Sequence, residues 1–378
     1  MFFDWLEIEQ EFDYQLPLLD GNAYARLVVE DGAVVEEGGI SSPAFSHKGS
    51  FCDSVRIKVN GSRLFMGGNP SRWGRVENLF GLRTIDQCVA VYNGILREVF
   101  EGYDRVPQFT KCTEVYYADG TAMEHIGADG AIIKGFHATE NVMVGAGNEK
   151  AYIAGISTLS YRNSIPHLFT NGYACDWSSK KGNSPLIYPS VYCKGNELEL
   201  HSLDKITRTF GPESDEVEHL KEVINYCWAV GLVRFELKFK SRYIQRNGMQ
   251  YWGLSNYSAV EQLVSEFVNI DQKLSVTAMD FETISERLLS AGIVESTKAA
   301  NTTAMYALQW MHGQEFDLLK SQVKINRARL RKIGIDIARP CNISKFSPIF
   351  VKTMTEVRSQ ICQPPSWYRL PNALRVVA

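Results

Sequence analysis

The sequence has 378 residues, of which 45% are hydrophobic and 22% are charged, and this is the composition of a globular protein of about two domains. The net charge of −3 excludes a uniformly basic nucleic-acid coat protein, although a local basic surface can still bind DNA. No stretch approaches the roughly 18 apolar residues of a membrane helix, and the acidic N-terminus is unlike a signal peptide, so we expect a cytoplasmic protein with no membrane partner.

Alternating apolar and polar residues indicate strands in much of the first part of the chain, and helical spacing dominates the remainder. Asn60-Gly61 between two alternating runs is the strongest short signal for a hairpin. Thr84 is placed to cap the N-terminus of a helix. In chain order we expect strands over 24–36, a hairpin over 55–66, a helix over 84–100, a meander over 110–144 with turns at 119–120 and 129–130, a helix over 149–160, a strand over 186–194, a helix over 214–230, a strand over 231–243, and helices over 257–268, 281–291, 300–320 and 322–333.

These elements predict an α+β fold in two parts. Residues 1–275 are expected to form an antiparallel sheet with flanking helices, and residues 276–378 a smaller all-α region. The boundary rests on the change in patterning, because no linker rich in Gly, Ser or Pro separates the two parts. The sequence has no Walker A, G-x-S-x-G or H-E-x-x-H motif, so the most familiar catalytic signatures do not explain it.

The segment Gly231–Lys240 alternates strictly between apolar and polar residues. Its polar face carries Arg234, Glu236, Lys238 and Lys240. An amphipathic strand with a solvated polar face is the simplest explanation. The functional alternative is a carboxylate that binds a divalent metal, flanked by cations that bind phosphates, which is the combination that a nuclease needs.

Five segments in order along the chain carry a family resemblance. They are residues 51–82, which include an N-x-F-G motif; Phe136-His137-Ala138-Thr139; the Tyr-x-Lys strand Ser190-Val191-Tyr192-Cys193-Lys194; GLVRFELKFKSRYIQRNGM from residue 231; and Pro365-Ser366-Trp367-Tyr368. Together they resemble the gene II/X replication proteins of filamentous phages, over nearly the whole chain. The resemblance implies that residues 1–275 are a relaxase-like nicking endonuclease domain and that residues 276–378 are a gene X-like domain.

The resemblance also implies a rolling-circle initiator with a tyrosine nucleophile, and Tyr192 is the candidate. Its oxygen attacks the scissile phosphorus and leaves a 5′-phosphotyrosine and a free 3′-OH, and the covalent bond allows the strand to be rejoined later without ATP. Lys194, two residues further along the expected strand face, is the candidate for stabilising the phenolate or a phosphate oxygen. Tyr188 is the nearest alternative nucleophile, but Pro189 is expected to disturb the strand there.

Mg²⁺ or Mn²⁺ is the expected cofactor, because an ion that prefers oxygen ligands can polarise the scissile phosphate. Glu236 is the first candidate ligand. His137 is the second, although the family pattern has an aspartate there, and imidazole ligates Mn²⁺ more readily than Mg²⁺. Glu140, Glu114 and Asp176 remain alternatives.

Basic residues near these positions are candidates for contacts with the double-stranded origin and with the nicked single strand. Ordinary solvated charge is the alternative explanation for each of them. The candidates are Arg234, Lys238, Lys240, Arg242, Lys180 and Lys181, together with Arg327 and Arg331 of an expected basic helix. The resemblance implies a host helicase and a DNA polymerase as further partners, and Met279 is a candidate start for a separate C-terminal product.

Three functions follow from these observations. The leading one is an origin-nicking initiator in the host cytoplasm. The second is a non-catalytic origin-binding protein, whose affinity depends on salt but which forms no covalent adduct. The third is a metal-dependent phosphodiesterase, which needs Glu236 and never forms a tyrosine adduct.

Overall fold

A computed structural model of the chain describes residues 1–19, 24–30, 33–41, 44–49, 54–117, 126–179, 184–271, 281–311, 313–339 and 359–371. Several predicted features lie outside these residues: the turns at 31–32 and 119–120, the candidate start Met279, and the candidate DNA contacts Lys180 and Lys181.

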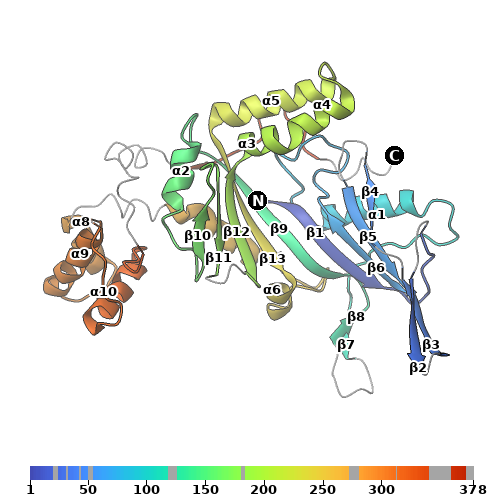
Figure 1. The fold of residues 1–378 in the computed structure, drawn as a ribbon, viewed down its shortest axis with the longest axis horizontal. Coiled ribbons are helices and arrows are strands. Elements are labelled where there is room, and N and C mark those ends of the chain that lie inside the picture. The colour runs from blue at the N-terminus through green and yellow to red at the C-terminus, as the bar shows by residue number, and fades with distance from the viewer. Residues whose placement is uncertain are drawn as a thin grey trace.

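One large antiparallel sheet dominates the described part of the chain (Figure 1). Its strands are β1 (Phe2–Glu11), β2 (Tyr24–Glu30), β3 (Ala33–Ser41), β4 (Phe45–Lys48), β5 (Ser54–Asn60), β6 (Arg63–Gly68), β9 (Ile132–Met143), β10 (Ile165–Leu168), β11 (Ala174–Ser178), β12 (Ile187–Cys193), β13 (Leu232–Lys240) and β14 (Gln360–Ile361). They are ordered β10-β11-β12-β13-β9-β1-β6-β5-β3-β2, with β14 paired to β9 and β4 paired to β5. The strands β7 (Val115–Tyr117) and β8 (Ile126–Ala128) form a separate hairpin.

The described residues form helices that pack on the sheet, up to α7, and three further helices, α8 to α10, that pack on one another. They are α1 (Ile85–Val99), α2 (Glu149–Ile156), α3 (Lys194–Leu198), α4 (Asp204–Phe210), α5 (Asp215–Val230), α6 (Ser241–Arg246), α7 (Ser258–Val268), α8 (Phe281–Ser290), α9 (Thr297–Met311) and α10 (Ser321–Lys332), with a single π-helical turn at Glu199–Leu203. The main core lies on one face, where α1, α2, α6 and α7 cover the apolar side of the central strands. A second core forms where α3, α4 and α5 meet the start of β13. The α+β class is therefore confirmed, and no helix in the described ranges is long and apolar enough to span a membrane.

The elements with the clearest local signals form as predicted. β5 and β6 pair around Gly61, whose φ of +62° lies in the left-handed region that glycine adopts without strain. Thr84 caps α1: its hydroxyl accepts the Gln87 N–H, and the Gln87 side chain accepts the Thr84 N–H in return. The meander expected over 110–144 is wrong in part, because β8 pairs with β7 and not with β9.

The central strand β1 is absent from the predicted elements. It lies between β9 and β6, with Leu6 opposite Phe136 on one side and opposite Gly68 on the other. Leu6 and Ile8 are fully buried, whereas the alternate residues point to the polar face. The alternation over Leu6–Glu11 was the signal that a strand begins the chain.

The C-terminal helices α8–α10 have an apolar core of their own. α9 ends at Met311, so the helix expected over 300–320 is shorter than predicted. The chain then returns to the sheet, where β14 pairs with β9 and Tyr368 is buried in the second core. The C-terminal part is therefore helical with an extended tail, and its division from the first part near residue 275 stays a prediction.

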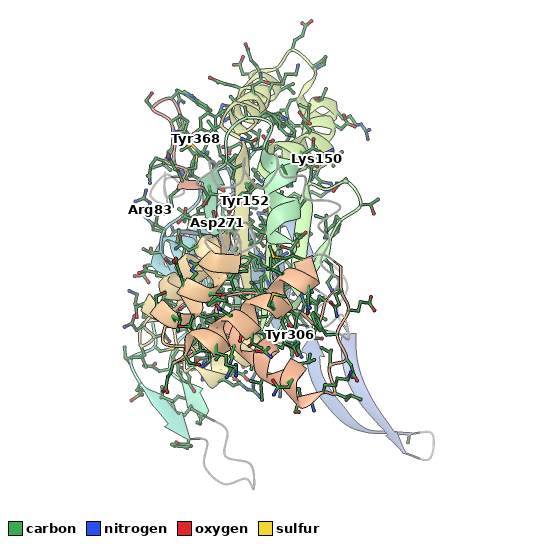
Figure 2. All side chains as sticks on the ribbon, turned by 90° about the vertical axis from the view of Figure 1, so that its left-hand side faces the viewer. Arg83, Lys150, Tyr152, Asp271, Tyr306 and Tyr368 are labelled. Carbon is green, nitrogen blue, oxygen red and sulfur yellow. The ribbon has the colours of Figure 1, made fainter. Side chains whose placement is uncertain are left out.

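Two residues that flank the C-terminal helices in the sequence, Asp271 and Ser359, meet at one carboxylate. Asp271 accepts hydrogen bonds from the hydroxyls of Tyr152, at 3.1 Å, and of Ser359, at 2.6 Å. Figure 2 shows Tyr152 and Asp271 next to each other, above Tyr306 of α9. Asp271 and Ser359 are thus fixed side by side on α2.

Gly231, between α5 and β13, tests how closely the backbone there packs against Gly145. It has a φ of +63°, and a Cβ there would overlap the carbonyl oxygen of Gly145. Gly248 has a φ of +64° with open space around it. We expect Gly248→Ala to cost about 1 kcal/mol of unfolding free energy for the left-handed backbone alone, and Gly231→Ala to cost clearly more. Urea denaturation of both variants measures this, and equal losses would contradict the close approach.

Candidate active site

Three neighbouring strands bring the predicted site residues to one face of the sheet. β13 pairs with β12 on one side and with β9 on the other, and the register places Ser190 and Thr139 directly opposite Glu236. Opposed residues of an antiparallel pair point to the same side, so the polar side chains form three rows of three. We call this set the polar grid, and its rows are Tyr192, Arg234 and Asn141; Ser190, Glu236 and Thr139; and Tyr188, Lys238 and His137.

Glu236 is the centre of the polar grid and joins the predicted nucleophile to the predicted second metal ligand. The Tyr192 hydroxyl donates to Glu236 Oε2 at 3.2 Å, and His137 Nδ1 lies 2.8 Å from Oε1. Lys238 Nζ lies 3.5 Å from the same Oε1. The Trp5 ring of β1 stacks on the His137 ring with centroids 5.8 Å apart. The structure thus brings together Tyr192, Glu236 and His137, which are distant in the sequence.

Burial and charge set the ionisation of the two central groups. Burial raises the pKa of Glu236, but the hydrogen bond and charge of His137 and the charge of Lys238 outweigh it and lower the pKa to about 2. Glu236 is therefore ionised at neutral pH. Burial and the charge of Glu236 raise the pKa of Tyr192 well above its ordinary value. Tyr192 is therefore a neutral hydroxyl in the free protein.

The two hydroxyls that flank Glu236 lack hydrogen-bond partners. The oxygens Thr139 Oγ1 and Ser190 Oγ are both buried and unpaired. Among the described residues, no three His, Cys, Asp or Glu side chains gather in a group that could hold a metal ion. Glu236 and His137 are thus a pair of possible ligands without a third of the usual types.

Arg234 is fully buried, so the prediction that it contacts DNA is corrected. Its Nε donates to Asn141 Oδ1 at 2.9 Å, and its Nη2 donates to the carbonyl oxygens of Asn78 and Leu79 at 2.8 and 2.6 Å. Its Nη1 lies 3.5 Å from Asp4 Oδ2. The segment that contains Asn78 covers Arg234, and the polar face of β13 is exposed to solvent only from Lys238 onwards.

Lys194 is also placed differently from the prediction. β12 ends at Cys193, and Lys194 is the first residue of α3, so the two-residue spacing from Tyr192 does not put both side chains on one strand face. The Lys194 side chain is 2% exposed, and its ammonium donates to Asn78 Oδ1 at 2.9 Å and to Glu197 Oε2 at 2.5 Å. Lys194 therefore holds the same covering segment as Arg234 does.

The alternative candidates occupy other places. Tyr188 shares the polar face and donates a hydrogen bond to Asp176. β12 pairs with β13 through Pro189 without a break in register, whereas its pairing with β11 ends at Ser190, so the expected disturbance is confined to the β11 side. Glu140 binds the N-terminal ammonium, and Glu114 is exposed beside the β7–β8 hairpin.

The remaining predicted DNA contacts fall in two places. Lys240 and Arg242 are exposed at the end of β13 and on α6, beside the polar grid. On α10, Arg327 forms a two-point ion pair with Asp336 at 2.6 and 3.0 Å, and the exposed Arg331 has its Nε 4.0 Å from the same carboxylate. Arg327 is therefore committed to a contact within the chain.

Sequence reasoning missed a second buried carboxylate, Glu77. It accepts hydrogen bonds from Arg75 Nη2 at 2.5 Å and from the Tyr368 hydroxyl at 3.0 Å, and the Phe80 N–H donates to the Tyr368 oxygen at 3.0 Å. The C-terminal tail is thereby fixed to the segment that covers Arg234. Both segments carry the family resemblance, which was the signal that they act together.

Comparisons with known families match both parts of the chain. Residues 1–261 match the family model for the N-terminal part of the phage replication-associated protein encoded by gene II, and residues 288–374 match the model for the C-terminal part of the same protein. The chain belongs to the gene II family of replication-associated proteins. It is 56% identical over 326 residues to the replication-associated protein of this family from Escherichia phage If1, covering 85% of this chain and 99% of that protein. No solved structure matches it.

The resemblance to gene II proteins is thus confirmed. The N-terminal family match contains the whole polar grid, and the C-terminal family match contains Tyr368. The contact between Glu77 and Tyr368 therefore links the two matched regions of this replication-associated protein.

The pKa of Glu77 gives a test of that link. Burial raises it, but the hydrogen bond with His219, the Arg75 charge and the Leu79 N–H together lower it from 4.5 to about 2. A pKa lowered by folding stabilises the fold above about 4.5, and this contribution is lost as the pH falls from there towards 2. We expect Glu77→Gln to be less stable at pH 7 by on the order of 3 kcal/mol and to lose less stability in that window.

Urea denaturation at several pH values measures the effect. Glu222→Gln, an exposed change on α5, is the matched control and should follow the wild-type curve. Parallel curves for wild type and Glu77→Gln would contradict the low pKa.

Proposed function

We propose that this replication-associated protein is a rolling-circle replication initiator that nicks one strand of origin DNA through Tyr192 and later rejoins the displaced strand. One observation carries the proposal: the Tyr192 hydroxyl lies 3.2 Å from Glu236, which in turn contacts His137 at 2.8 Å. A nucleophile next to a carboxylate that a third group orients is the arrangement expected of an activated oxygen. The family membership and the order of the resembling segments support it.

The chain's own residues perform the steps as follows. Glu236 orients the Tyr192 hydroxyl towards the phosphorus. The Tyr192 oxygen–phosphorus bond forms as the phosphorus–O3′ bond breaks, the phenolic proton moves to Glu236, and the departing 3′ oxygen takes up a proton from water. In rejoining, a 3′-OH attacks the phosphorus of the phosphotyrosine and gives its proton to water, the bond between phosphorus and Tyr192 breaks, and the Tyr192 oxygen takes its proton back from Glu236.

Glu236 and His137 fit a divalent cation, because they place a carboxylate oxygen and an imidazole nitrogen side by side next to two unpaired hydroxyls. Mg²⁺ or Mn²⁺ bound there supplies the positive charge that offsets the charge of the scissile phosphate. This positive charge also favours the ionised form of Tyr192, whose raised pKa otherwise keeps it protonated.

Exposed cations extend the DNA-binding surface on both sides of the site. Lys238 and Lys240 lie over the Tyr188 ring at 5.6 and 5.9 Å, and with Arg242 they suit a single strand that passes along β13. Arg331 and the other exposed cations of α10 suit the duplex origin, because that helix carries no acidic residue. The proposal includes action on DNA in the host, with a host helicase and polymerase as partners.

Replacing Tyr192 tests the proposal. With supercoiled DNA that carries the origin and with Mn²⁺, we expect wild type to produce nicked circles and a covalent adduct. Tyr192→Phe keeps the ring and removes the attacking oxygen, so nicking should fall by at least about 1,000-fold. Gel analysis measures nicking, and mass spectrometry of the DNA–peptide adduct names the nucleophile.

Tyr188→Phe is the matched control, because Tyr188 lies on the same face but contacts Asp176 instead of Glu236. An adduct on Tyr188 would overturn the assignment of Tyr192. Origin binding by wild type without any nick would favour the non-catalytic alternative, and cleavage without an adduct would favour the phosphodiesterase.

A further inference from the structure

Helix α10 packs with one face and exposes the other. Val323, Asn326 and Leu330 are buried, and Asn326 Oδ1 accepts a hydrogen bond from the Thr303 hydroxyl of α9 at 2.8 Å. The exposed residues of α10 are neutral or basic, and none is acidic. They are Ser321, Gln322, Lys324, Ile325, Ala328, Arg331 and Lys332. α9 therefore supports α10 from one side and leaves this set exposed on the other.

The exposed residues are arranged in a definite order around the helix. With about 3.6 residues per turn, Ile325 and Ala328 lie opposite the buried residues. Lys324 and Arg331 flank them on one side, and Gln322 lies on the other. Ile325 is 46% exposed. A narrow strip of apolar and small side chains thus runs along the middle of a basic face.

The charges of α10 do not suit a helix that has only water around it. Acidic residues near the start of a helix stabilise it, and the first turn of α5 carries three of them. The first turn of α10 carries none, and the exposed cations Lys320 and Lys324 lie near that end. These cations are repelled by the positive end of the helix dipole. A partner that brings negative charge removes this cost.

We propose that α10 is a recognition helix that enters the major groove of the duplex origin and reads its bases with Gln322, Ile325 and Ala328. This inference rests on the proposed function, which supplies the origin as the partner, and adds how the origin is told from other DNA. The major groove admits one α-helix, and apolar side chains there contact thymine methyl groups while glutamine binds adenine. Lys324 and Arg331 then reach the phosphates and set the orientation of the helix.

A duplex fits α10 better than a single strand does. Unpaired bases bind by stacking on aromatic rings, and α10 has no aromatic residue. The Tyr188 ring, by contrast, lies under Lys238 and Lys240 on the polar grid. The two surfaces therefore divide the work, with the duplex read at α10 and the single strand held along β13.

Binding of labelled duplexes, followed by fluorescence anisotropy, tests this inference. The protein is the full chain with Tyr192→Phe, which keeps the DNA intact. One duplex carries the origin of the replicon that encodes the chain, and the other has the same bases in shuffled order. We expect Ile325→Ala to weaken binding of the origin duplex about tenfold and to leave binding of the shuffled duplex unchanged.

Met305→Ala is the matched control. Met305 is 47% exposed, close to the value for Ile325, but it lies two residues after Thr303 and so on the opposite side of α9 from α10. We expect it to leave both affinities unchanged. Equal losses with both duplexes for Ile325→Ala, or no loss with either, would overturn the inference, and so would equal affinity of the parent for the two duplexes.

Lys324→Gln gives a second readout, because a phosphate contact is independent of sequence. We expect it to weaken both duplexes alike and to reduce the slope of log affinity against log salt by about one. Ile325→Ala should leave that slope unchanged. An unaltered slope in Lys324→Gln would show that this face does not contact phosphates, which contradicts a helix seated in the groove.

Thermal unfolding shows whether Ile325 acts through the fold. Ile325 lies outside the apolar core of α8–α10, so Ile325→Ala should unfold at the temperature of the parent. A lower temperature together with weaker binding of both duplexes would assign Ile325 to the fold and overturn the inference.

Nicking of a single-stranded origin oligonucleotide separates this inference from the proposed function. Ile325→Ala, with Tyr192 in place, leaves the polar grid intact, so we expect it to nick at the wild-type rate. If wild type nicks and Ile325→Ala binds both duplexes like its parent, the inference is overturned and the proposed function stands. If wild type never nicks and Ile325→Ala still loses affinity only for the origin duplex, the nicking proposal is wrong and base reading by α10 stands.

Discussion

The pairing register of β13 is the constraint on which the rest of the structure depends. Glu236 faces Tyr192, His137 and the two hydroxyls only because β12 and β9 are both in register with β13. A slip of one residue on either side would turn Glu236 towards the main core and replace it by Phe235 or Leu237. The apolar residues of β13 are buried against α2, α6 and α7, so the hydrophobic effect that stabilises the core also selects the register of the polar grid.

Buried charges hold the covering segment over one end of the grid. Arg234 and Lys194 both bind Asn78, and Asp4 accepts hydrogen bonds from the amides of Asn69 and Asn78 at 2.6 Å. Such a network adds little net stability, because each charge loses its hydration, but it fails if one partner is removed. The network fixes positions: Tyr192 lies between the covered residues around Arg234 and the rest of the polar grid.

The sequence predicts which residues share one face of a strand, but it does not predict which other segment covers that face. Alternation placed Arg234 and Glu236 on one side of β13, but periodicity carries no information on which residues another segment buries, so the burial of Arg234 was missed. The meeting of Tyr192, Glu236 and His137 depends on long-range pairing, and only the family resemblance pointed to it. Lys194 was misplaced because a two-residue spacing does not show where a strand ends, and β12 ends before Lys194. β1 was missed although Leu6 and Ile8 alternate with acids, because the strand starts with the adjacent apolar residues Phe2 and Phe3, which do not alternate.

The position of β1 has a consequence for the order in which the molecule is built. This strand is synthesised before its partner β9, which follows more than a hundred residues later. Until then an apolar strand lacks one of its neighbours, which invites pairing between nascent chains. Glu7, Glu9 and Glu11 alternate with the buried residues and place negative charge along the exposed face of the waiting strand. Like charges oppose self-association, so these acids protect the chain during synthesis from the strand that later becomes the middle of its sheet.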